Sequence, residues 1–170
     1  MEINYYRKLK NIDRLSRMPK LRQYNLIEHS YMVTILFRHF ASKEDVPYDM
    51  VVLDYVMHHD ILEAETGDLP YDIKCMNDVT EHAWRSLEIE VSKRHHQLRR
   101  YTDVNIKEAL TPLQFQLFKI CDTLDLWIFL KEEEGLGNRS AQCLEIIATC
   151  ERMIKGKFIS VDKYMNDYQF

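Results

Sequence analysis

Helix-breaking residues are scarce in this chain, which has only four glycines and four prolines in 170 residues. Residues that favour helices, such as Leu, Ile, Lys and Glu, are common instead. Few breakers argue against a many-stranded sandwich, which needs frequent turns. We therefore expect an all-α fold. The length and the 46% hydrophobic content suffice for one domain, residues 1–170, with a substantial core.

Apolar residues recur at helical spacing in several segments, which sets the expected helices. Pro19 restricts Met18 to extended geometry and so separates the first two helices. Pro112 suits a first helical turn, and Gly135 or Gly137 can close the helix that follows. The expected helices cover residues 2–15, 25–41, 49–66, 79–100, 112–134 and 141–154, with a shorter piece at 107–109.

Charge and composition exclude several functions. No apolar run approaches the roughly 20 residues that span a bilayer, the first residues lack a secretory layout, and the four cysteines show no paired spacing. A reducing cytoplasm fits best. Residues 1–22 carry a local charge of +5 and the remainder −9, which disfavours bulk nucleic-acid binding. The basic segment suits either a small phosphorylated substrate or a solvated helix face.

One stretch concentrates chemically active side chains. His58, His59, Asp60, Glu63 and Glu65 follow a largely apolar segment, and Gly67 then favours a helix end. In a continuous helix, Glu63 shares a face with His59 and Asp60, because residues three and four apart are neighbours. An imidazole and a carboxylate beside a second carboxylate suit a divalent-metal site with an adjacent acid or base.

Two further side chains could complete such a site. His29 lies on the apolar stripe of its helix, where a histidine is either a core residue or a ligand. Asp122 interrupts an apolar run, so it needs a cation, a positive side chain or hydrogen-bond donors, and Asp125 shares its face. Ligands on separate helices are how helical folds build interior metal sites. Two imidazoles and two carboxylates suit Zn, Mn, Fe or Co better than Ca.

These motifs, in this order, resemble the HD-domain metal-dependent phosphohydrolases, and within them the YfbR-like 5′-deoxynucleotidases. The resemblance covers roughly residues 10–140. It is carried by Arg17-Met18-Pro19, Glu28-His29-Ser30, His59-Asp60 with Glu63, the run Thr66-Gly67-Asp68-Leu69-Pro70, and Lys119-Ile120-Cys121-Asp122. Compact phage relatives of the DatZ type, which remove triphosphate from dATP, share nearly the same motifs.

The resemblance implies an HD-domain helical bundle with a metal site in its core. Its metal ligands are His29, His59, Asp60 and Asp122, binding a divalent transition metal (Co, Mn or Zn). The catalytic carboxylate is Glu63, and Arg17, Met18 and Asp68 bind the substrate. The resemblance assigns phosphate to Arg17 and the sugar to Asp68. Met18 replaces the tryptophan with which the family selects deoxyribose.

The expected reaction is removal of the 5′-phosphate from deoxynucleoside monophosphates by a metal-activated water. The alternative is a deoxynucleoside triphosphate triphosphohydrolase. A non-catalytic helical module with a structural metal is a second alternative, although Glu63 would have no use there. Regulators acting on (p)ppGpp usually carry more sequence between the first histidine and the HD pair.

Related enzymes form homo-oligomers, and the tail with Tyr164, Tyr168 and Phe170 suits either an interface or core closure.

Overall fold

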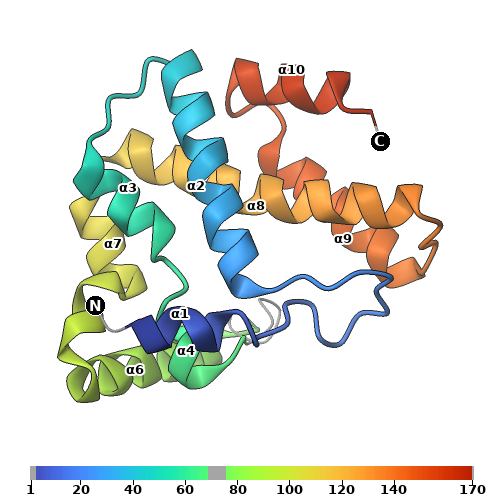
Figure 1. Cartoon of the computed structure of the whole chain (residues 1–170). Helices are drawn as coiled ribbons and strands as arrows, with labels where there is room; N and C mark the ends of the chain where they lie inside the picture. The colour runs from blue at the N-terminus through green and yellow to red at the C-terminus, as the bar shows by residue number, and fades with distance from the viewer. Residues whose placement is uncertain (1–2, 69–75, 170) are drawn as a thin grey trace.

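A computed structural model describes residues 3–68 and 76–169 of the chain (Figure 1). Within these ranges the elements are helical, apart from an isolated β-bridge between Asp13 and Asn25. The expected all-α fold is confirmed. The helices are α1 (Ile3–Leu9), α2 (Leu26–Lys43), α3 (Met50–Met57), α4 (Glu63–Thr66), α6 (Asp78–Arg94), the 3-10 helix η1 (His96–Tyr101), α7 (Asp103–Ala109), α8 (Pro112–Gly135), α9 (Ala141–Ile154) and α10 (Ile159–Asp167).

Helices α2 and α8 cross at the centre of the molecule and pack closely against each other (Figure 1). On α2 the fully buried stripe includes Val33, Phe37 and Phe40, and on α8 it includes Leu124 and Leu130. Both helices begin with a capping residue. The Asn25 side chain accepts a hydrogen bond from the Glu28 amide, and Thr111 forms a capping box with Gln114 ahead of α8.

The last two helices cover this core. Helix α9 packs on α8 and buries Cys143, Ile147, Cys150 and Ile154, which recur at steps of three and four. Helix α10 returns across α2, and the Tyr164 ring meets that of Phe40 edge-on, with 5.7 Å between centroids. The Tyr168 ring lies 5.2 Å from that of Trp127. The C-terminal tail was expected either to form an interface or to close the core, and the ring contacts of Tyr164 and Tyr168 support core closure. Phe170 lies outside the described residues.

The expected continuous helix over residues 49–66 is wrong, because it breaks at His58. The chain leaves α3 after Met57 and resumes only in the short α4. The Nδ1 atom of His59 lies 2.8 Å from the carbonyl oxygen of Val56. That carbonyl is the one that the Asp60 amide would use in an uninterrupted helix. The histidine ring thus competes with the backbone hydrogen bond and opens a turn.

Two other expected helices are too long. The first stops at Leu9 instead of residue 15, because the chain turns there and Arg14 donates its amide to the Tyr24 carbonyl at 2.6 Å. The segment expected as one helix over 79–100 is divided at His95 into α6 and η1. None of the helices in the described part of the chain is long and apolar enough to cross a lipid bilayer.

Candidate metal centre

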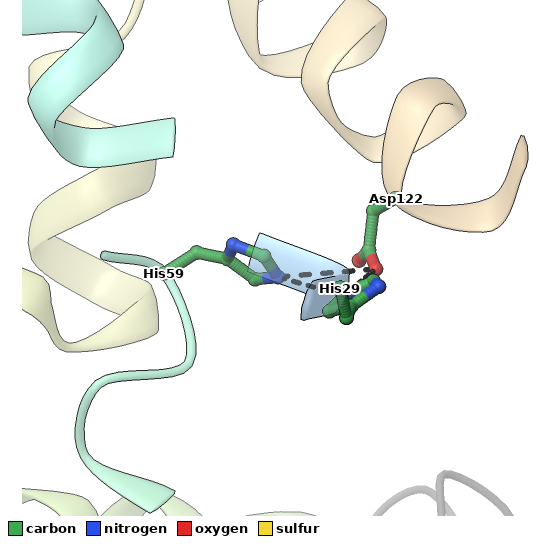
Figure 2. Close-up of side chains that lie close together, drawn as sticks. All are labelled: His29, His59 and Asp122. Atoms are coloured by element: carbon green, nitrogen blue, oxygen red, sulfur yellow. Dashed lines mark hydrogen bonds and ion pairs between the residues drawn. The ribbon is translucent and has the colours of Figure 1, made fainter. Parts of the chain in front are cut away.

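Three side chains from separate parts of the chain meet between α2 and α8. His29 comes from the first turns of α2, Asp122 from α8, and His59 from the turn after α3 (Figure 2). His29 Nε2 lies 3.2 Å from His59 Nε2 and 3.2 Å from Asp122 Oδ1. The donor atoms of all three residues lie within 4.8 Å of one another.

Asp60 adds a fourth donor to this group. Its Oδ2 atom lies 3.3 Å from His59 Nε2 and 3.6 Å from His29 Nε2. The structure thus brings together the four side chains that the sequence pattern suggested as ligands. The break in the helix at His58 makes this possible, because His59 and Asp60 lie in a turn instead of on a regular helical face.

The tautomers of the two histidines favour a cation between them. His59 Nδ1–H donates to the Val56 carbonyl, and His29 Nδ1–H donates to Asp125 Oδ2 at 2.8 Å. Both Nε2 atoms then present lone pairs to each other and to a carboxylate. A tetrahedral Zn site with Zn–N of 2.0–2.1 Å separates its ligand atoms by about 3.3 Å, which is close to the observed spacing. The donor set therefore fits a divalent transition metal.

The excess of negative charge at the centre also favours a bound cation. The carboxylates around it belong to Asp60, Glu63, Asp122 and Asp125, whereas the fixed cations near them, among the described residues, are Arg14 and Lys119. Burial tends to raise the pKa of Asp60, but His59 and Arg14 lower it well below its usual range. The pKa of Asp122 is likewise lowered, against burial, by Lys119 and the histidines. These two carboxylates are therefore ionised, as metal ligands must be.

His29 is held from behind by a buried hydrogen-bond network that sequence reasoning did not predict. Asp125 accepts from His29 Nδ1 and also from the Tyr24 hydroxyl, at 2.6 Å. The Tyr24 hydroxyl lies 3.1 Å from the same histidine nitrogen. Such a carboxylate fixes the ring orientation and the tautomer of a metal-ligating histidine. Only the spacing of Asp125 from Asp122 hinted at this role.

Glu63 begins α4 and is buried, with 4% of its surface exposed. Its backbone amide donates to the carbonyl of Asp60 at 3.0 Å, so Glu63 follows this proposed ligand within the same turn of the chain. Glu65 points elsewhere, because it forms an ion pair with Lys8 at 2.5 Å.

His58 and the three expected substrate-binding residues lie in different surroundings. His58 turns away from the cluster and receives the Tyr6 hydroxyl hydrogen bond at 2.7 Å. Of the expected substrate-binding residues, Arg17 is exposed, Met18 is buried and Asp68 is half-buried. Leu69 and Pro70, which also carry the resemblance, lie outside the described residues.

Comparisons with known proteins identify the family of this chain. A family model described as 5′-deoxynucleotidase YfbR-like matches residues 3–169. A 5′-deoxynucleotidase of Cronobacter sakazakii is 31% identical over 149 residues, covering 79% of this chain and 73% of that protein.

Solved structures share the fold. An HD-domain phosphohydrolase of Listeria innocua aligns with a TM-score of 0.79 and 20% identity, covering 96% of this chain and 84% of the other. The cyanophage S-2L HD phosphohydrolase DatZ, solved with dA and one catalytic Zn²⁺ ion, aligns with a TM-score of 0.68 and 20% identity, covering 90% of this chain and 82% of the other.

The helical fold and the His, His-Asp and Asp cluster define the class as an HD-domain phosphoric ester hydrolase. Within that class, the chain belongs to the YfbR-like 5′-deoxynucleotidase family.

Proposed function

We propose that this protein removes the 5′-phosphate from deoxynucleoside monophosphates, releasing a deoxynucleoside and orthophosphate. The observation that carries the proposal is the cluster of His29, His59, Asp60 and Asp122 together with the buried Glu63, which follows Asp60 by three residues and donates its backbone amide to the Asp60 carbonyl at 3.0 Å. A purely structural metal site has no need of that carboxylate. The 31% identity to a protein described as a 5′-deoxynucleotidase supports the monophosphate as substrate.

His29, His59, Asp60 and Asp122 would hold the metal. When bound, a divalent cation supplies a water of lowered pKa and offsets the negative charge of the phosphate. Glu63 lies next to the cluster and transfers a proton, either from the attacking water or to the leaving O5′ oxygen. Water adds to phosphorus as the P–O5′ bond breaks, and the deoxynucleoside leaves with a protonated 5′-hydroxyl group.

The resemblance also assigns substrate contacts to three residues. Arg17 would bind the phosphate, Asp68 would accept a hydrogen bond from the sugar, and Met18 would lie against the deoxyribose. Methionine is smaller than the tryptophan usual at this position and presents no flat ring to the sugar. We therefore expect weaker discrimination between dAMP and AMP than in the family at large.

A triphosphohydrolase is the second candidate, favoured by the shared fold with DatZ, which was solved with dA and zinc. Product analysis separates the two. The protein, loaded with Co²⁺, Mn²⁺ or Zn²⁺, is incubated with dAMP, AMP or dATP, and the products are resolved by ion-exchange chromatography. Orthophosphate from dAMP supports the proposal, whereas tripolyphosphate from dATP supports the alternative.

The Asp60→Ala variant, purified in parallel, controls for contaminating phosphatases. Activity that persists in that variant does not belong to this protein. If the metal-loaded protein binds zinc tightly and releases neither product, the site is structural and the proposal is wrong.

A further inference from the structure

A second arginine, Arg14, reaches the metal centre from the loop that follows α1. Its Nη1 atom lies 3.9 Å from Asp60 Oδ2, and its side chain is only 17% exposed. The guanidinium lies over the Tyr24 ring, with 5.3 Å from Cζ to the ring centroid. Arg14 therefore contacts a proposed metal ligand directly, whereas Arg17 is exposed.

The backbone around Arg14 is fixed in place. Its amide donates to the Tyr24 carbonyl, and its carbonyl accepts from the Lys20 ammonium group. The next residue, Leu15, has φ 54°, in the left-handed region that bulky residues rarely adopt. Such a conformation is unfavourable and persists only where the surroundings dictate it, often at ligand-binding segments. Here it turns the chain immediately after Arg14.

The guanidinium is charged and offers a donor to the site. An arginine guanidinium keeps its proton in proteins, and this one lies 3.9 Å from the Asp60 carboxylate. Within the described part of the chain, the buried Nη1 atom of Arg14 has no hydrogen-bond partner. A buried donor left without an acceptor destabilises the protein. Its position beside the metal ligands indicates that an anionic ligand supplies the acceptor.

A simpler interpretation is that Arg14 only offsets the charge of the neighbouring carboxylates. A bound divalent metal already does so, and a fixed positive charge beside it opposes metal binding. An arginine with no other task would thus weaken the site it belongs to. Binding of the substrate anion by the guanidinium would offset this weakening of metal binding.

We propose that Arg14 binds a non-bridging oxygen of the substrate phosphate next to the metal. This inference rests on the proposed function, because it assigns the phosphate-binding residue of the same site. Its planar guanidinium can hold two phosphate oxygens at once, which a lysine cannot do equally well. Arg14 would act in addition to Arg17.

The test measures binding of two ligands separately. Arg14→Gln and Arg14→Lys are loaded with metal, and binding of orthophosphate and of deoxyadenosine is measured by calorimetry, alongside kcat/KM for dAMP. A lost charge-assisted contact of about 1.5–3 kcal/mol weakens orthophosphate binding by roughly ten- to a hundredfold in Arg14→Gln. Arg14→Lys should be intermediate. Deoxyadenosine binding should change less than about twofold, and metal affinity should stay equal or rise, because a neighbouring positive charge is gone.

Arg139→Gln is the matched control, because it removes an exposed arginine that pairs with Glu134 at the far end of α8. Three results would overturn the assignment. Tighter metal binding by Arg14→Gln, with unchanged orthophosphate binding, would show that Arg14 only offsets the charge of the neighbouring carboxylates. Equal loss of metal, orthophosphate and deoxyadenosine would make it structural. Loss of orthophosphate binding in Arg17→Gln but not in Arg14→Gln would give the role to Arg17.

The result is separable from the proposed function. If the wild-type protein binds orthophosphate through Arg14 but releases nothing from dAMP, the phosphate site stands and the substrate assignment fails. If dAMP is hydrolysed normally by Arg14→Gln with an unchanged KM, the substrate assignment stands and the phosphate site fails.

Discussion

His29 donates a hydrogen bond to Asp125 behind the metal centre, with 2.8 Å between Nδ1 and Oδ2. The proton on Nδ1 leaves the Nε2 lone pair directed at the cluster, where His59 and Asp122 converge. Tyr24 donates its hydroxyl to the same carboxylate oxygen at 2.6 Å, and its ring stacks on Phe129 with centroids 4.2 Å apart. The orientation of His29, a proposed metal ligand, thus depends on a buried network contributed by a loop and by α8.

We expect Asp125→Asn to lower metal affinity, because an amide holds the tautomer of His29 less strongly than a carboxylate does. Loss of such a partner typically costs about 10–100-fold in metal affinity. Competition with a chromophoric chelator measures this directly. Tyr24→Phe keeps the ring and the carboxylate, so its loss should be smaller. Unchanged metal affinity in Asp125→Asn, with a normal unfolding temperature, would show that the contact is not needed to orient His29.

Metal removal should abolish hydrolysis, and Co²⁺ or Mn²⁺ should restore it. Because the metal binds the folded chain, it should also raise the unfolding temperature. Ligand at one hundred times its dissociation constant stabilises the folded state by about 2.7 kcal/mol. Differential scanning fluorimetry with and without EDTA checks the second effect independently of turnover. Full activity in excess EDTA, with no metal found by elemental analysis, would contradict the assignment.

Glu63 is expected to serve catalysis without holding the metal. Glu63→Ala should retain metal while turnover falls by about 10²–10⁴-fold, the usual contribution of general acid–base catalysis. Asp60→Ala should lose metal and activity together. Glu65→Gln is the matched control, because Glu65 pairs with Lys8 away from the cluster. Metal loss in Glu63→Ala as large as in Asp60→Ala would make Glu63 a ligand.

Local patterns predict the two central helices and two of the proposed metal ligands. His29 sits on the apolar stripe of α2, and Asp122 interrupts an apolar run in α8, so both were expected to face the interior. Asn25 and Pro112 marked the starts of the same two helices. These features are encoded within one or two helical turns, which is why periodicity and capping residues reveal them.

The supporting residues could not be predicted in the same way. Asp125 meets His29 across 96 positions of sequence, and nothing in its own helix marks that contact. Arg14 is one of seven basic residues in the first 22, and only the left-handed Leu15 and the pairing with Tyr24 set it apart. The helix break at His58 depends on a histidine ring reaching a backbone carbonyl, and helical periodicity does not register such a contact.

Glu133 should anchor the loop that carries Arg17 and Met18. Its fully buried carboxylate accepts the backbone amides of Leu21 at 2.7 Å and Arg22 at 2.9 Å, and the Asn138 amide at 3.0 Å. Glu133→Gln places an amide group against these donors and should destabilise the fold by about 1.5–3 kcal/mol at neutral pH. Urea denaturation measures the change in the free energy of unfolding. Glu132→Gln, which removes a half-exposed ion pair with Arg22, should cost under about 1 kcal/mol.

The contribution of Glu133 to the free energy of unfolding should depend on pH. Burial tends to raise the pKa of Glu133, but the Leu21 amide, Asn138 and Arg22 lower it below its usual value. A carboxylate with a lowered folded pKa contributes stability above its unfolded pKa of about 4.3, and that stability disappears as pH falls through the folded value. The difference in unfolding free energy between wild type and Glu133→Gln should therefore be constant from pH 7 to about 5 and shrink below about 4.3. A difference that stays constant down to pH 3 would show that the ionised carboxylate does not anchor the loop.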